Sequence, residues 1–427
     1  MKLKNLHIDS YRHLENVHFD FTYPEGHKKA GQPLEKICLI GQSATGKTTI
    51  LELIKDSISK IDTLKILNGE FIFHHFQLNF DGHLTFLYDN VSLKVSTNEI
   101  SLNDQEYKNL PNGSGSVTHL FAKGLRLLYS TSEIISKEVV NIFNQNPINI
   151  VTDFSIEKYA GFFEGDAEAN YIIELGQTVN EEIWLSLLYK ILDYRKRFNQ
   201  WASLLLNRSV IGDLNKLNKQ IAKWNETNPN PLVDIADFFN PIVSKLNLEV
   251  DLVNTEFSIP FKSKIKDEVV PVSGLSTGTK GLLLTMFPLY ELDTNDAIIL
   301  MDEPERSLFP DIQLELIDTY KRLAPNAQII VATHSPFIAA AFEPEERFIL
   351  YFNEDGNVAV RRGESPIGDD PNDMLYNDFK VSYYNEFGKA AYKEYVNLQR
   401  RAKQEKEPEE KKKLVVEMAK LGNKYNF

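Results

Sequence analysis

A phosphate-binding loop is the clearest chemical feature of this sequence. Residues 41–48 read Gly-Gln-Ser-Ala-Thr-Gly-Lys-Thr, a complete G-x-x-x-x-G-K-T motif. A strand-like run, 36–40, precedes the motif and a helix-like run, 48–54, follows it. In that context the backbone N–H groups, one lysine and one hydroxyl can surround the phosphates of a nucleoside triphosphate and its Mg²⁺. The residues expected to contact the nucleotide in this loop are Gly41, Gln42, Ser43, Ala44, Thr45, Gly46, Lys47, Thr48 and Thr49.

Two adjacent carboxylates form the second candidate site. The apolar run 298–301 leads directly into Asp302 and Glu303. One carboxylate at such a strand end can assist Mg²⁺ and the other can orient an attacking water, because phosphoryl transfer depends mainly on positioning and charge. Many ordinary strands also end in acids, so the pair gains its significance from the phosphate loop elsewhere in the chain.

Two further polar segments lie beside apolar ones. Residues 275–280 read Leu-Ser-Thr-Gly-Thr-Lys before a helix-like run, so Ser276 and the backbone around Gly278 predict an anion site at a helix N-terminus. Thr-His-Ser-Pro at 333–336 places His334 at the end of the apolar run 328–332. Each segment alone also fits a structural role, as a helix cap or a packed histidine.

The order of these segments resembles that of the ABC-type ATPase heads, and it is most similar to their SMC-like, RecF-like and OLD-like branch. The resemblance covers roughly residues 1–175 and 248–352. It implies an α/β fold with a mixed β-sheet and helices, an antiparallel β subdomain, a short helical insertion and a helical C-terminal tail. The implied division is 1–177 for an N-terminal ATPase lobe, 178–247 for the helical insertion, 248–380 for a C-terminal ATPase lobe and 381–427 for a charged helical tail.

The resemblance also implies a role for each matching residue. ATP and Mg²⁺ are the implied cofactors. Ser276 and Gly278 would cap the γ-phosphate bound to the opposite protomer, Ser307 would belong to the loop after the acids, and Arg12 would lie near the nucleotide. The implied catalytic residues are Glu303, His334 and Lys47, and the implied metal-binding residues are Thr48, Asp302 and Gln145.

Two departures from the family pattern stand out. Thr279 replaces the glutamine or glutamate that usually follows the signature glycine, which puts the rate of hydrolysis in doubt. The glutamine that these heads place near the metal has two candidates, Gln145 and Gln77, of which we favour Gln145.

Composition narrows the function classes. The 427 residues carry a net charge of −13, with local excesses of +3 over 178–228 and +4 over 381–427. These basic segments could contact phosphates or could be solvated helix faces. The single cysteine, the absence of an apolar leader and the lack of any ~18–20-residue apolar run favour a cytoplasmic protein without a membrane segment.

The spacing of the motifs favours one functional class over the others. Lys47 and Ser276 are 229 residues apart, whereas transporter heads bring these motifs much closer together. The leading hypothesis is an ATPase that dimerises head to head and senses double-stranded DNA or controls a separate effector, such as a nuclease, in anti-phage defence of the Septu, retron-associated or PARIS type. The alternatives are a RecF-like repair or chromosome clamp and a nucleotide-gated scaffold with little turnover. No intrinsic nuclease is expected.

Overall fold

The computed structural model describes most of the chain. The described residues are 1–62, 65–67, 70–72, 77–88, 90–97, 99–103, 105–108, 117–119, 125–135, 137–160, 171–176, 180–207, 214–381, 386–405 and 407–425. They form two compact units, Met1–Gly368 and Asp369–Phe427. The four-part division expected from the sequence is finer than this and stays a prediction, and its boundary at 177–178 lies outside the described residues.

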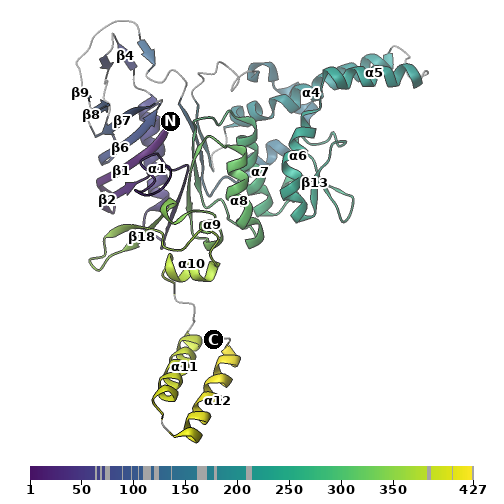
Figure 1. Ribbon diagram of the computed structural model, residues 1–427. Coiled ribbons are helices and arrows are strands. Elements are labelled where there is room, and N and C mark those ends of the chain that lie inside the picture. Colours follow the sequence, from purple (N-terminus) through teal and green to yellow (C-terminus); the bar gives the residue numbers. More distant parts are fainter. Residues whose placement is uncertain are drawn as a thin grey trace. The chain divides into compact units, whose positions relative to one another are not determined.

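A seven-stranded sheet in the first unit carries the motif-bearing strands (Figure 1). Its order is β12-β11-β16-β17-β3-β18-β19, and every neighbouring pair is parallel except β18 with β19. The central strands are almost entirely apolar, as expected for a parallel sheet covered on both faces. The bounds are β3 Lys36–Gly41, β11 Arg126–Ser130, β12 Tyr171–Leu175, β16 Ile298–Asp302, β17 Gln328–Thr333, β18 Arg347–Phe352 and β19 Val358–Arg362.

A second, antiparallel sheet faces the first across helix α1. Its order is β2-β1-β6-β7-β8-β9, and its strands alternate buried and exposed side chains because only one face meets the core. The bounds are β1 Lys2–Tyr11, β2 Leu14–Asp20, β6 Asp81–Tyr88, β7 Val91–Ser96, β8 Glu99–Leu102 and β9 Gln105–Lys108. Two three-stranded sheets contain β4 Lys65–Leu67, β5 Glu70–Ile72 and β10 Val117–His119, and β13 Leu248–Val250, β14 Phe261–Ser263 and β15 Val269–Val270.

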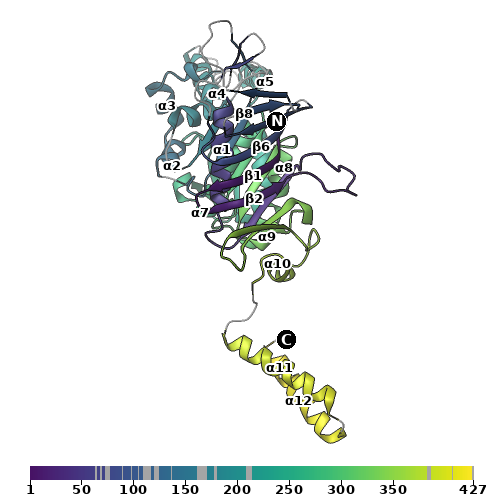
Figure 2. The ribbon, with the colours of Figure 1, turned by 90° about the vertical axis from the view of Figure 1, so that its left-hand side faces the viewer.

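Helix α1 (Lys47–Asp62) is packed between the two large sheets (Figure 2). Its apolar residues recur at helical spacing, and Ile50, Ile54 and Ile58 are fully buried in the same core as strands of both sheets. Gln328, at the start of β17, also joins the two sheets. Its buried side-chain amide accepts from the Leu3 N–H in β1 (2.7 Å) and donates to the Leu3 carbonyl (2.9 Å). The phosphate-loop helix is therefore held in a fixed position between the two sheets.

Helices α7 (Thr277–Glu291) and α8 (Pro310–Leu323) cover the other face of the seven-stranded sheet (Figure 1). The buried residues of α8 include Ile312, Leu316 and Tyr320, spaced at one-turn intervals along one side. The shorter helices of this unit are α2 Lys137–Asn144, α3 Pro147–Asp153, α9 Pro336–Ala339 and the 3₁₀ turns Ile156–Tyr159, Ser244–Leu246, Val272–Gly274 and Pro344–Glu346.

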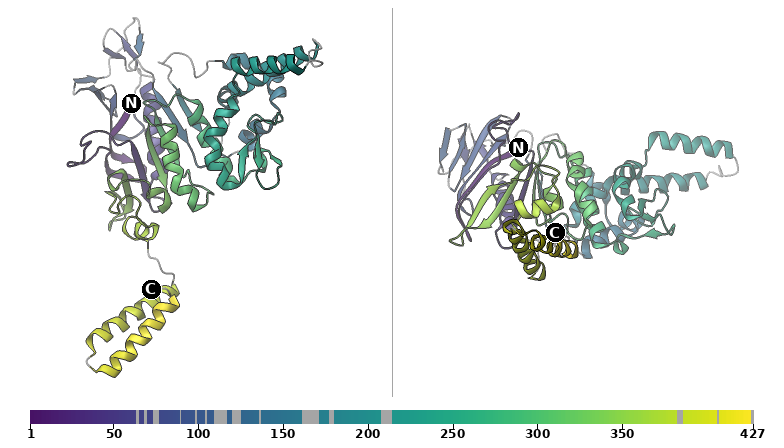
Figure 3. Two further views of the ribbon diagram at one scale, coloured as in Figure 1. Left: turned by 45° about the vertical axis from the view of Figure 1, so that its right-hand side comes forward. Right: turned by 60° about the horizontal axis from the view of Figure 1, so that its bottom comes forward.

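A helical arm occupies much of the predicted insertion. Helices α4 (Glu181–Asn207) and α5 (Leu214–Thr227) extend together from the body, and α6 (Pro231–Val243) returns to it (Figure 3). The first part of α4 is buried, whereas Leu206 near its end is 62% exposed. The Trp201 and Trp224 rings stack with their centroids 4.9 Å apart and thereby hold α4 against α5.

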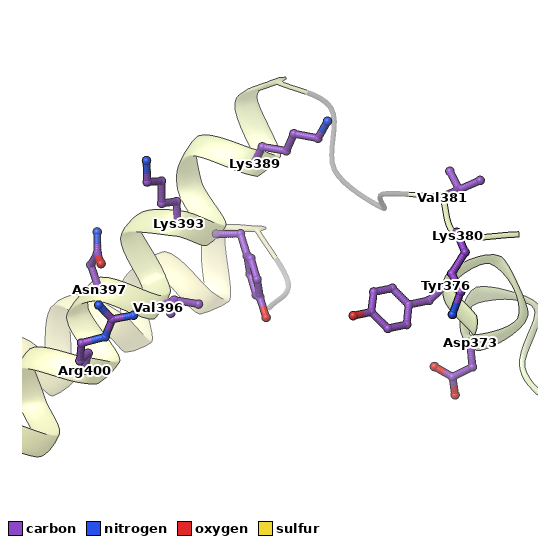
Figure 4. Close-up of a pocket in the computed structure, with 10 residues that line it drawn as sticks. Asp373, Tyr376, Lys380, Val381, Lys389, Lys393, Val396, Asn397 and Arg400 are labelled. Carbon is purple, nitrogen blue, oxygen red and sulfur yellow. The ribbon is translucent and has the colours of Figure 1, made fainter. Parts of the chain in front are cut away.

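The second unit is helical. It contains α10 (Pro371–Asn377), α11 (Glu386–Gln404) and α12 (Pro408–Tyr425), and a small apolar cluster around Leu398, Ala402 and Leu414 joins the last two. Figure 4 shows basic side chains along α11, and the exposed residues Lys389, Lys393 and Arg400 share one side of the helix.

The predicted fold class is confirmed. The chain has a mixed α/β architecture with an antiparallel β subdomain, a helical insertion and a helical C-terminal region. No helix among the described residues is both long enough and apolar enough to cross a bilayer.

Candidate functional site

The phosphate loop lies at the carboxyl edge of the parallel strands, between β3 and α1. The Lys47 ammonium donates to the carbonyl oxygens of Gly41 (2.9 Å) and Gln42 (3.0 Å), so the side chain lies across its own loop. Burial is the largest cause that lowers the pKa of Lys47, to about 8, while Glu303 and Asp302 oppose the shift. This desolvated cation can gain strongly from a phosphate, because little competing water surrounds it.

Thr48 and Asp302 meet beside this loop although 254 residues separate them. The Thr48 hydroxyl lies 3.1 Å from each carboxylate oxygen of Asp302. Burial raises the pKa of Asp302, and the hydrogen bond from Thr48 opposes that rise. One hydroxyl and one carboxylate are hard oxygen donors of the kind that Mg²⁺ accepts, with phosphate oxygens and waters completing its shell. The donor set therefore fits the expected ion.

This site differs from an all-protein metal cage. In the described ranges of the chain, no group of three or more His, Cys, Asp or Glu side chains is placed to hold a metal ion. A Mg²⁺ site that relies on the nucleotide needs no such group, because the phosphates supply ligands.

Glu303 and His334 face each other at adjacent strand ends. His334 Nε2 lies 3.7 Å from Glu303 Oε1, and both side chains are roughly 40% exposed. The Glu303 backbone is left-handed (φ 47°), which is uncommon outside glycine and turns the chain sharply after β16. Burial lowers the pKa of His334, and the nearby Lys47 lowers it further, so the imidazole is neutral at pH 7.

The signature segment caps helix α7. Ser276 Oγ accepts from the Thr279 backbone N–H at 3.2 Å and lies 2.7 Å from the Thr279 hydroxyl. Thr279, the departure noted in the sequence, therefore takes part in the N-cap. Ser276 and Thr277 are exposed, whereas Gly278 is buried against the segment that follows Glu303. The N-terminal end of α7 is thus open to an external ligand.

The β1–β2 turn lies against the phosphate loop. Arg12 Nη1 lies 3.3 Å from Glu52 Oε2 on α1, which ties the turn to that helix. A Cβ added to Gly46 would lie 3.0 Å from His13 Nε2, so the imidazole rests on the loop. His13 is a residue that the motif reasoning missed, and its only sequence signal was its position directly after Arg12.

The position of Gln145 is set by helix α2. It follows α2 and is exposed, its backbone N–H donates to the Asn141 carbonyl at 3.1 Å, and no hydrogen bond in the described structure joins it to Thr48 or Asp302. The strand next to β16 is β11, which ends at Ser130 opposite Met301. The metal role of Gln145 stays a prediction.

Comparison with known proteins also indicates an ATPase. The sequence model of the AAA ATPase domain family matches residues 56–339, more than half of the chain. The chain belongs to this family.

Individual relatives are more distant. The Septu protein PtuA of Bacillus thuringiensis is 39% identical over 67 residues, which are 16% of this chain and only 17% of that protein. The Smc head domain of Pyrococcus furiosus, solved bound to the C-terminal domain of ScpA, is 14% identical with a TM-score of 0.39, over 84% of this chain and 96% of that one. The SMC head domain of Thermotoga maritima is 13% identical with a TM-score of 0.39, over 86% and 100%. The fold is established by the strand order of the sheets, and these two structural similarities do not contribute to that assignment.

Proposed function

We propose that this AAA ATPase-family chain binds ATP with Mg²⁺ and hydrolyses it. The observation that carries the proposal is the Thr48 hydroxyl, 3.1 Å from both carboxylate oxygens of Asp302 and next in sequence to the buried Lys47. This arrangement combines a desolvated cation for the phosphates with oxygen donors for the metal. When bound, Mg²⁺ supplies charge stabilisation to the phosphoryl group.

Three residues around this centre have separate roles in the proposed hydrolysis. Glu303 lies at the strand end, partly exposed, and can accept a hydrogen bond from the attacking water. His334 is neutral and can therefore donate one N–H while its other nitrogen accepts. Lys47 provides positive charge near the terminal phosphates.

A second protomer completes the site in this proposal. The exposed N-terminal end of α7 presents Ser276 and free helix N–H groups, which favour an anion. Within one protomer Ser276 Oγ is engaged in the cap of its own helix. Two heads facing each other would place this end over the γ-phosphate held by the other phosphate loop.

The biological role that we propose is control of a separate effector, such as a nuclease, or sensing of double-stranded DNA, in anti-phage defence. The partial likeness to a Septu protein supports the defence setting. The basic excesses over 178–228 and 381–427 support contact with a polyanion. A RecF-like clamp and a nucleotide-gated scaffold remain the alternatives.

The first test measures steady-state ATPase rates with and without double-stranded DNA. Lys47→Ala should lose ATP binding, whereas Glu303→Gln should lose turnover and accumulate an ATP-bound dimer, detected by light scattering. Stimulation by DNA would support sensing, and its decline in a salt series would follow counterion release. A Glu303→Gln variant with wild-type turnover would overturn the hydrolytic assignment.

A mixing experiment tests the shared site. Ser276→Arg and Lys47→Ala should each be inactive alone, because every homodimer site then carries one defect. Mixed chains should regain one working site per heterodimer, formed by the intact phosphate loop of one chain and the intact α7 end of the other. A mixture without activity would refute the two-chain site.

A further inference from the structure

A buried carboxylate that the proposed mechanism does not use lies directly beneath His334. Glu305 is 8% exposed, and its Oε1 accepts from the Thr333 hydroxyl (2.5 Å) and from the His334 backbone N–H (3.3 Å). It therefore joins the turn after Glu303 to the end of β17.

The direction of this hydrogen bond follows from the carboxylate, which can only accept. The Thr333 hydroxyl therefore donates to Glu305, while Thr333 Oγ1 accepts from the Ser335 N–H at 2.9 Å. Ser335 Oγ also lies 2.5 Å from Gln313 Oε1 on α8. The backbone on both sides of His334 is thus held by side-chain hydrogen bonds.

Placing a carboxylate here is costly to the fold. Burial raises the pKa of Glu305 to about 6, the Thr333 hydrogen bond opposes the rise, and the charge of Glu303 adds to it. Glu305 Oε2 has no hydrogen-bond partner in the described structure. Burying a carboxylate with one oxygen unpartnered is unfavourable for folding, which argues that Glu305 serves a purpose besides stability.

The same turn contacts the signature helix and the loop after β11. A Cβ on Gly278 would lie 2.3 Å from the Ser307 carbonyl oxygen, so the backbones of α7 and the turn touch. Arg306 Nη1 donates to the Ser132 carbonyl at 2.9 Å. A displacement of residues 303–308 would therefore move His334 and the N-terminal end of α7, which we expect to face a partner.

We propose that Glu305 is a positioning residue that holds His334 against Glu303 and links this pair to the N-terminal end of α7. The inference rests on the proposed ATPase function for its kinetic consequence, and on geometry alone for the placement of the imidazole. The carboxylate acts through the Thr333 hydroxyl and the His334 N–H and does not touch the nucleotide.

The test compares three conservative variants, of which Thr333→Val and Glu305→Gln keep the size of the side chain and Thr333→Ser removes one methyl group. Thr333→Val removes the hydroxyl, Thr333→Ser keeps it, and Glu305→Gln keeps an acceptor at the Oε1 position. Thr333→Val should lower kcat about tenfold, the loss expected for one hydrogen bond to a charged group. The KM for ATP should change less than about twofold, because the phosphate loop is untouched. Thr333→Ser should retain most of the wild-type kcat, whereas Glu305→Gln, which keeps an acceptor but removes the charge, should fall between Thr333→Ser and Thr333→Val.

A second readout separates this proposal from the proposed function. NMR of the full chain with labelled histidine, assigned by His334→Gln, should show a displaced His334 imidazole signal in Thr333→Val and a wild-type signal in Thr333→Ser. If the wild type does not hydrolyse ATP, the proposed function fails and the imidazole signal alone decides the positioning role. An unchanged signal in Thr333→Val, or an unchanged kcat in a chain that does hydrolyse ATP, overturns the proposal.

Discussion

Two glycines of α7, less than one turn apart, should respond to alanine in opposite ways. At Gly278 a Cβ would lie 2.3 Å from the Ser307 carbonyl oxygen and 2.9 Å from Leu308 Cδ2. At Gly281 a Cβ would meet only Ile135 Cδ1, at 3.5 Å. The first site has no room for a methyl group, whereas the second gives it an ordinary van der Waals contact.

The magnitudes follow from these distances. Ordinary contact begins at 3.4 Å, so Gly278→Ala must move the backbone of the turn by about 1 Å, because a backbone carbonyl cannot rotate away as a side chain does. Overpacking of this kind costs about 1–3 kcal/mol. Gly281→Ala removes the entropic cost of a glycine inside a helix and should stabilise the chain by about 0.5–1 kcal/mol.

Thermal unfolding of the two variants beside the wild type tests this prediction. The midpoint should fall by about 1–4 °C in Gly278→Ala and rise by about 1 °C in Gly281→Ala, because the unfolding entropy grows with the size of the unit. Gly278→Ala should also weaken ATP-dependent dimerisation, because the turn and the end of α7 shift together. A Gly278→Ala chain as stable as Gly281→Ala would refute the close contact with Ser307 and the link between the turn and α7.

Two further predictions concern the phosphate loop and the arm. Lys47 has a pKa of about 8 and must be charged to hold phosphate, so the Kd for ATP should rise about tenfold from pH 7 to pH 9 as the proton is lost. Fluorescent-nucleotide titrations check this, and Lys47→Ala should show no binding at either pH. Trp224→Ala removes the stacking on Trp201, worth about 1 kcal/mol, and should lower amide-exchange protection in α5 about fivefold while ATP affinity is unchanged. Unaltered exchange in α5 would contradict a holding role for this pair.

The sequence predicted the phosphate loop because its strand, turn and helix are contiguous, and it predicted the fold class through the order of several such local motifs. The apolar run before Gly41 and the amphipathic run after Lys47 determine a strand, a tight turn and a helix wherever the chain places them. The same local logic applies to the apolar strand that ends at Asp302. Contiguous patterns could not place Gln145 relative to this strand end, because its position after α2 depends on how that helix packs.

Strand order was decided by the tertiary structure. β3 lies between β17 and β18, so the ends of strands far apart in sequence meet at one edge. This neighbourhood depends on which apolar faces bury one another, and such contacts leave no mark in a local pattern. The hydrogen bond between Thr48 and Asp302 forms because this strand order brings the two residues together.

The residues that tertiary structure alone revealed are those whose partners come from elsewhere in the chain. His13 rests on Gly46 because a hairpin turn reaches the phosphate loop. Glu305 binds the end of β17 because a left-handed residue at Glu303 turns the chain toward it. Sequence by itself determined which side chains could do the chemistry, because residue type and local spacing set those properties. Tertiary packing decided which of them meet, since burial of distant surfaces brings them together.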